Sequence, residues 1–264
     1  MTDTNPVPPV LQAAWGMRER PSKGPKPTLS VDRIVLAAIG VARAEGYPAV
    51  SMSRVAGELN TAAMSLYRYV ASKDELAVLM MEAATGEPPA PRADGETWRA
   101  AVERWAHAMF AMFGAEPWFL QVPVAGPPAT PRQLAWMETG LAALDGTPPS
   151  EGEKLSLLLL INGYIRYEAL LHSQMTEAAR SDGRTVDAVL TEFGGLMRHL
   201  VQADRFPLLR RAIDAGAMDK PSGPDGSAPS SPDGSVPSSP DGSFAFGLAR
   251  ILDGVETFIR SRAA

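Results

Sequence analysis

The chain has 264 residues, of which 45% are hydrophobic and 21% charged, which is typical of a soluble protein with one large or two ordinary domains. It contains no cysteine, and this excludes a disulfide framework and a thiolate zinc site. A net charge of −5 argues against a non-specific coat on nucleic acid, and with neither a signal peptide nor a membrane-length apolar run we expect a cytoplasmic protein.

The first 29 residues carry six prolines and little hydrophobic periodicity, so we expect a flexible arm. The arm contains Arg18, Arg20, Lys23 and Lys26. Basic arms contact phosphates or enter a minor groove, although a purely solubilising tail fits this composition equally well.

Helical patterns follow the arm. Ser30 is placed as the N-cap of a first helix that ends at Gly46, and Ser51 as the N-cap of a second that ends before Asn60. Asn60 occupies a turn where a left-handed residue is needed. A third helix is expected from about residue 62 to residue 70.

A capping-box pattern, Ser72 with Glu75, opens a fourth helix that ends near Gly86. The proline-rich run at 87–91 then marks a boundary between residues 30–86 and a larger region, 92–264.

The larger region shows further helical patterns and no sustained alternation of strand type, so we predict an all-α fold. The expected helices cover residues 97–114, 131–144, 150 to about 176, 185–203, 207–215 and 244 to the end. A second capping box, Ser150 with Glu153, opens the long apolar helix.

Between residues 219 and 243, Pro-Asp-Gly-Ser recurs three times with a period of eight residues. Proline, glycine and serine do not build a core, so this segment is interpreted as a disordered surface loop.

The second and third helices form a helix-turn-helix, the arrangement that places one helix in the DNA major groove. At about 100° per residue, Leu66 and Val70 pack inward, and the opposite side faces the groove. Arg68 suits guanine or phosphate, Met64 a thymine methyl, and Lys73 the DNA backbone. The predicted DNA-binding residues are Ser51, Thr61, Met64, Ser65, Tyr67, Arg68, Tyr69 and Lys73.

The segment from Ser30 to Leu76 resembles the N-terminal DNA-binding domain of the TetR family of bacterial transcriptional regulators. The resemblance rests on the run Leu-Tyr-Arg-Tyr-Val-Ala-Ser-Lys-Asp-Glu-Leu at 66–76 and on the second helix at 52–59, with Asn60 in place of the family's usual glycine. The segments at 15–20 and 24–27 are similar to an extension found in some actinobacterial members.

This resemblance implies an N-terminal three-helix DNA-binding domain followed by a larger helical domain for ligand binding and dimerisation. It implies a homodimer that binds double-stranded operator DNA and is released, as a repressor, by a small effector. By position, the helices at 155–173 and 244–260 form the dimer pair, although an ordinary buried core would explain their apolar faces as well.

The effector site is expected among aromatic and Met-rich positions, which suit apolar or planar ligands, although most of these side chains would serve equally as core. Polar Asn162 and Arg166 on an apolar helix are the better candidates for orienting a ligand. The predicted ligand-binding residues are Trp105, Met109, Phe113, Trp136, Asn162, Arg166, Tyr167 and Phe193.

No cofactor or metal is expected, because His107, His172 and His199 are isolated and lack a metal-binding spacing. We expect no enzyme activity, since no phosphate loop or paired acid and base is recognisable. Two alternatives stay open: a helical protein-interaction adaptor, or a small-molecule enzyme with a non-functional DNA-binding head.

Overall fold

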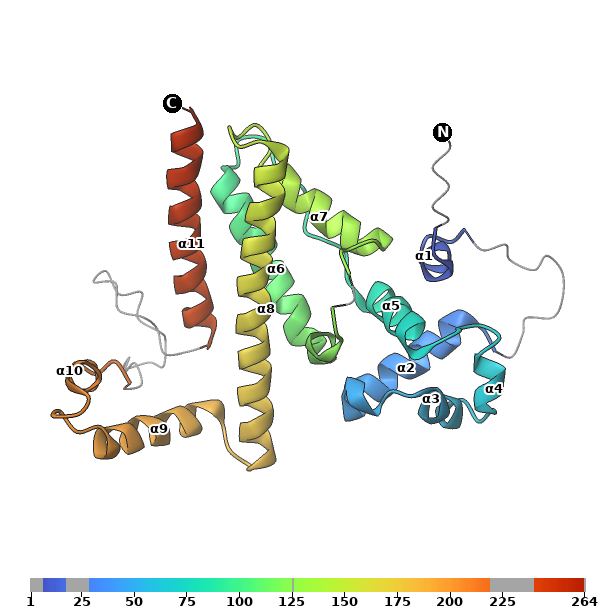
Figure 1. Ribbon diagram of the computed structural model, residues 1–264, viewed down its shortest axis with the longest axis horizontal. Helices are drawn as coiled ribbons and strands as arrows, with labels where there is room; N and C mark the ends of the chain where they lie inside the picture. Colours follow the sequence, from blue (N-terminus) through green and yellow to red (C-terminus); the bar gives the residue numbers. More distant parts are fainter. Residues whose placement is uncertain (1–6, 18–28, 125, 219–239, 264) are drawn as a thin grey trace. The chain divides into compact units, whose positions relative to one another are not determined.

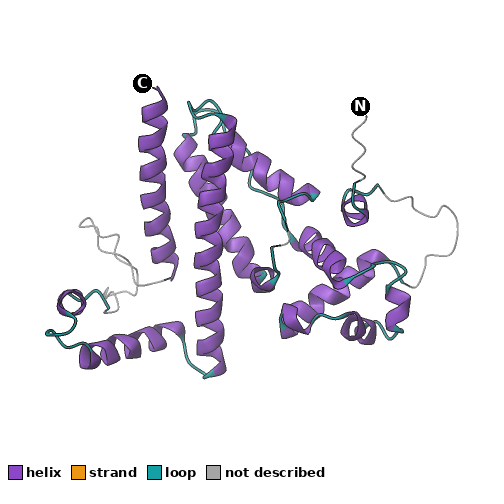
Figure 2. Cartoon of the chain, in the orientation of Figure 1, coloured by secondary structure: helices purple, strands orange, loops and turns teal. Residues whose placement is uncertain are grey.

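The computed structural model describes residues 7–17, 29–124, 126–218 and 240–263, and within these ranges every regular element is helical (Figures 1 and 2). The chain divides into two compact units, residues 1–147 and 148–264. The all-α prediction is confirmed. No helix within the described ranges is long and apolar enough to cross a bilayer.

The first unit holds the predicted helix-turn-helix. Its helices are α1 (Pro9–Ala14), α2 (Val31–Glu45), α3 (Met52–Glu58), α4 (Ala63–Leu66), α5 (Lys73–Ala84), α6 (Trp98–Ala115) and α7 (Pro131–Ala143), with short 3-10 helices η1 (Tyr47–Ala49) and η2 (Pro117–Gln121). Helix α2 packs against α3, α5 and η1, and this cluster, with α4, is the DNA-binding head. Its core includes Ile34, Val55, Leu66 and Leu76, all fully buried.

The helix caps of the head agree with the sequence. Ser30 Oγ accepts from the Arg33 amide at 3.2 Å, and Gly46 ends α2 at a φ of 81°. Asn60 has a φ of 50°, the left-handed conformation expected in the turn between α3 and α4.

Two features of the first unit differ from the sequence prediction. The third helix is shorter than residues 62–70: α4 ends at Leu66, and the next residues form a turn in which the Val70 amide still donates to Leu66 O. The expected irregular arm contains α1, which packs on α5, and Trp15 Nε1 donates to Ala129 O at 2.9 Å. The basic residues of the arm lie outside the described residues.

The second unit consists of α8 (Glu151–Ser181), α9 (Val186–Leu200), α10 (Pro207–Asp214) and α11 (Pro240–Ala263). The predicted capping box at its start is present, since the Ser150 amide donates to Glu153 Oε2 at 2.9 Å. Helix α8 runs five residues beyond the predicted end, and α11 begins at Pro240, so it includes the last Pro-Asp-Gly-Ser copy. The remainder of the predicted loop, residues 219–239, lies outside the described residues.

Helices α8 and α11 lie side by side (Figure 1), and Tyr164 joins them. Its ring stacks on Phe244 at 5.7 Å between centroids, and its hydroxyl donates to the carbonyls of Ser243 and Phe244, at 3.1 Å each. Burial, with the neighbouring Glu168 charge, raises the pKa of Tyr164 to about 12. Gly247 on α11 leaves the space that the hydroxyl occupies.

Replacing Gly247 by alanine should therefore destabilise the protein, because the new methyl group would overlap with the Tyr164 hydroxyl. We expect a loss of about 1–3 kcal/mol, typical of overpacking, measured by urea unfolding. Gly254→Ala on the same helix is the matched control: nothing lies near its added Cβ, so it should be neutral or stabilising by up to about 1 kcal/mol. Equal effects of the two substitutions would contradict this account of the α8–α11 contact.

Candidate nucleic-acid interface and effector region

The surface of the head around α4 is formed by the side chains that lie opposite a buried seam, which consists of Leu66 and Val70. Leu66 and Val70 are fully buried. Between and before them, Met64 is 75% exposed, Tyr67 is 46% exposed, and Arg68 is also exposed. An apolar, an aromatic and a cationic side chain therefore share one exposed surface, which we call the groove face. This is the chemistry needed to contact base edges and phosphates.

The other predicted DNA-binding residues frame this surface. Thr61, Ser65 and Tyr69 are half-buried. Ser51 has a structural task, because its hydroxyl accepts from the Arg54 amide at 3.1 Å as the N-cap of α3. Half-buried Lys73 begins α5, and its Nζ lies 4.7 Å from the centroid of the Tyr47 ring.

The start of α5 is held by a carboxylate. The Glu75 amide donates to Ser72 Oγ at 3.0 Å, and Glu75 Oε2 accepts from the Ala71 amide at 2.8 Å. These two bonds fix the turn after α4, and with it the position at which Lys73 enters the helix.

A buried carboxylate connects the head to the end of α6. Glu116 is 7% exposed and accepts hydrogen bonds from Arg43 of α2, at 3.0 and 3.1 Å from Nε, and from Trp118 Nε1 at 2.6 Å. Burial opposes the charge of Glu116, but the bonds from Arg43 and Trp118 outweigh it, so the pKa of this carboxyl lies below its usual range. Arg43 and Glu116 are 73 residues apart, so no local sequence pattern predicts their contact.

The predicted effector residues fall into two groups. Trp105, Met109, Phe113 and Trp136 are buried in the first unit on α6 and α7. The two indoles are hydrogen-bonded: Trp105 Nε1 donates to Trp136 O at 2.9 Å, and Trp136 Nε1 donates to Gly86 O, just beyond α5, at 2.8 Å. The structure therefore gives both indoles a packing role.

The second group lies on helices of the second unit. Asn162 and Arg166 are half-buried on α8, and burial lowers the pKa of Arg166. Tyr167 is 64% exposed on α8, and Phe193 is 48% exposed on α9. That Asn162 and Arg166 orient a ligand stays a prediction.

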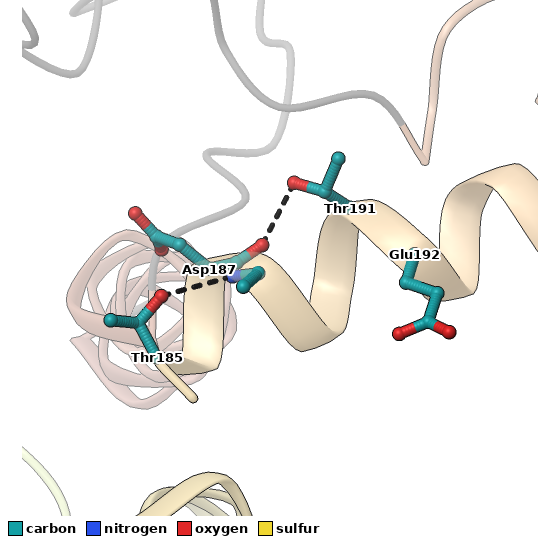
Figure 3. Close-up of a pocket in the computed structure, with 5 residues that line it drawn as sticks. Thr185, Asp187, Thr191 and Glu192 are labelled. Atoms are coloured by element: carbon teal, nitrogen blue, oxygen red, sulfur yellow. Dashed lines mark hydrogen bonds between the residues drawn. The ribbon is translucent and has the colours of Figure 1, made fainter. Parts of the chain in front are cut away.

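A shallow pocket at the start of α9 contains none of the predicted effector residues (Figure 3). Its hydrogen bonds belong to the helix itself: the Ala188 amide donates to Thr185 Oγ1 at 3.2 Å, and Thr191 Oγ1 donates to Asp187 O at 2.8 Å. Within the described part of the chain, no group of three metal-ligating side chains comes together.

Two protein-family models match this chain, one in the DNA-binding head and one in the region that follows it. The family model "Bacterial regulatory proteins, tetR family" matches residues 34–80, and "Tetracyclin repressor-like, C-terminal domain" matches residues 90–259. The chain is 35% identical over 255 residues to the HTH-type transcriptional repressor DrrR1 of Streptomyces coeruleorubidus, covering 96% of this chain and 87% of the relative.

Solved structures of the Streptomyces coelicolor protein ActR are similar as well. The complex of ActR with actinorhodin is 26% identical, with a TM-score of 0.67 over 88% of this chain and 98% of ActR. Apo ActR superposes with a TM-score of 0.69 over 91% of this chain and 100% of its own at 24% identity, which supports the fold.

The Glu116 cluster gives a prediction for acid stability. Because the folded-state pKa of Glu116 is depressed, its stabilisation is complete above the unfolded pKa and is lost as pH falls through the folded value. Glu116→Gln keeps an acceptor for Trp118 but removes this titration. Urea unfolding between about pH 6 and 3 should show a flatter acid loss for Glu116→Gln than for the native protein. Asp94→Asn, at an exposed loop carboxylate, is the control; a native-like profile in Glu116→Gln would refute the assignment.

Proposed function

The chain belongs to the TetR family of bacterial transcriptional regulators, as a ligand-responsive DNA-binding repressor, and we propose that it acts as a homodimer on a pseudo-palindromic operator. A small apolar or aromatic effector releases it by favouring a state whose two heads no longer fit the operator. Its site of action is the bacterial cytoplasm, where the operator lies.

The groove face carries this proposal. Exposed Met64, Tyr67 and Arg68 stand on a fully buried seam, so their positions are fixed before DNA arrives. Arg68 would pair with guanine or phosphate, and Met64 would contact a thymine methyl. This retained chemistry argues against the adaptor and enzyme alternatives, whose DNA-binding heads would be idle.

The dimer face is proposed on α8. Leu155, Leu159, Tyr167 and Leu171 recur every fourth residue with Gly163 between them, and each of these four large side chains is at least 41% exposed. A contiguous apolar stripe of this kind marks an interaction site. Two heads held about 34–36 Å apart would then read successive major grooves.

Asn162 and Arg166, both half-buried on α8, are proposed as the groups that orient the effector, and the buried aromatic side chains of α6 and α7 stay predicted effector residues within their own unit. Apolar walls with few polar groups are typical of small-molecule sites. The similar protein ActR is bound to actinorhodin in its solved structure, so actinorhodin is a suitable first effector probe.

A genomic selection tests the function. The purified protein is mixed with sheared genomic DNA of its source at moderate salt, and the retained fragments are sequenced. Enrichment of one palindromic site is expected for a specific dimeric repressor. Recovery of no fragment, or of unrelated fragments in proportion to their length, would refute the proposal.

The groove face gives a second prediction. Tyr67→Ala should weaken binding to the selected fragment by about 1–3 kcal/mol while leaving the melting temperature unchanged, because the side chain is 46% exposed. Phe206→Ala, at an aromatic residue that is 42% exposed in the second unit, is the matched control and should bind like the native protein. Anisotropy titration measures both; equal affinities would exclude Tyr67 from the interface.

The dimer face gives a third prediction. Leu159 is 72% exposed, so Leu159→Glu should leave the protomer folded but place two charges in the apolar contact between copies. Light scattering after size-exclusion chromatography should show monomers, and operator affinity should fall at least about 100-fold. A dimer of native stability would place the contact elsewhere.

A further inference from the structure

Lys73, which is proposed to contact DNA, lies over an aromatic ring. Its ammonium lies 4.7 Å from the centroid of Tyr47, which is 8% exposed on η1. A cation within about 6 Å of an aromatic face is attracted by the quadrupole of the ring, and more strongly when it is desolvated. A free lysine side chain samples many rotamers, so a ring that restrains Lys73 lowers the entropy cost of bringing it to a phosphate.

Tyr47 is in turn held by η2. The Tyr47 amide donates to Gln121 Oε1 at 2.8 Å, and η1 packs against η2. Gly46 lets the chain approach this closely: its φ is 81°, and an added Cβ would lie 3.1 Å from Gln121 Oε1. The backbone that carries the ring is therefore bonded to Gln121, the last residue of η2, which lies outside the head.

We propose that Tyr47 is a positioning residue for DNA binding, which holds the Lys73 ammonium toward a phosphate and is itself held by Gln121. The role rests on the proposed function, since it needs Lys73 at the DNA. It adds a direct route from the second family domain, residues 90–259, to a DNA contact: Gln121, Tyr47, Lys73. A shift of η2 would reach Lys73 through one hydrogen bond and one ring contact.

The salt dependence of binding tests this relay. Each phosphate contact adds about 0.9 to the slope of log affinity against log salt. The homodimer carries two copies of Lys73, so Lys73→Ala should lower the slope by about 1.8 and reduce the weakening between 50 and 200 mM salt by about 12-fold. Tyr47→Leu removes the ring face and should cause the same reduction, whereas Tyr47→Phe keeps the face and should rescue the native slope. The probe is a short duplex containing the site enriched in the genomic selection.

A double-mutant cycle separates positioning from general damage to the head. In the Lys73→Ala background, Tyr47→Leu should cause no further loss of slope or affinity. Additive losses, or a native slope in Tyr47→Leu, would overturn the relay. Arg180→Ala, which removes one positive charge from the last turn of α8, is the charge control and should keep the native slope.

A measurement without DNA tests the geometry itself. The ε-methylene protons of Lys73 should resonate upfield because of the Tyr47 ring current, and the shift should vanish in Tyr47→Leu, persist in Tyr47→Phe and shrink in Gln121→Ala. A native dimer that binds its site while Lys73 is unshifted would overturn the relay alone. A native protein with the shift but no specific DNA binding would instead refute the proposed function and, with it, this role.

Discussion

The DNA-binding head depends on one packing constraint, the full burial of Leu66 and Val70 against the rest of its core. Because the side chains of Leu66 and Val70 are buried, the geometry of the backbone between them directs the side chains of Tyr67 and Arg68 toward solvent. The left-handed turn at Asn60 brings α4 to this seam. The groove face is therefore a consequence of core packing, so its chemistry can vary with little effect on the stability of the head.

The polar contacts between the head and the region after α6 have a different character. Glu116 is buried and receives both a guanidinium and an indole N–H, so removing it would leave a buried Trp118 donor unpaired at about 1–3 kcal/mol. The Gln121 contact, by contrast, is a single hydrogen bond, which the Tyr47 amide donates to the exposed Gln121 side chain. The Glu116 contacts are suited to hold the head against the end of α6. The single Gln121 bond is weak enough to break when η2 shifts slightly.

The sequence predicted the contacts between residues that are close in the chain, and it did not predict those between residues that are far apart in it. Caps at Ser30, Gly46 and Ser150 were predictable because the capping residue and the helix it ends are adjacent. The early end of α4 was not, because an apolar stripe continues through a tight turn as well as through a helix. The bond from Tyr47 to Gln121 spans 74 residues, and no spacing rule addresses such a pair. Residue type alone also did not show that the indole N–H groups of Trp105 and Trp136 donate to backbone carbonyls; their place in an effector site stays a prediction.

Those two indoles bear on how an effector would act. Population shift requires an effector to bind one state of the protein better than another. Trp136 donates to Gly86 O, immediately after the helix that begins with Lys73, and Trp105 donates to Trp136 O. A ligand packed against these side chains would contact groups that are hydrogen-bonded to Gly86 O, just beyond α5. Its preference between states would then depend on whether Gly86 O keeps that bond, so a packing role for the indoles and a part in the effector response are compatible.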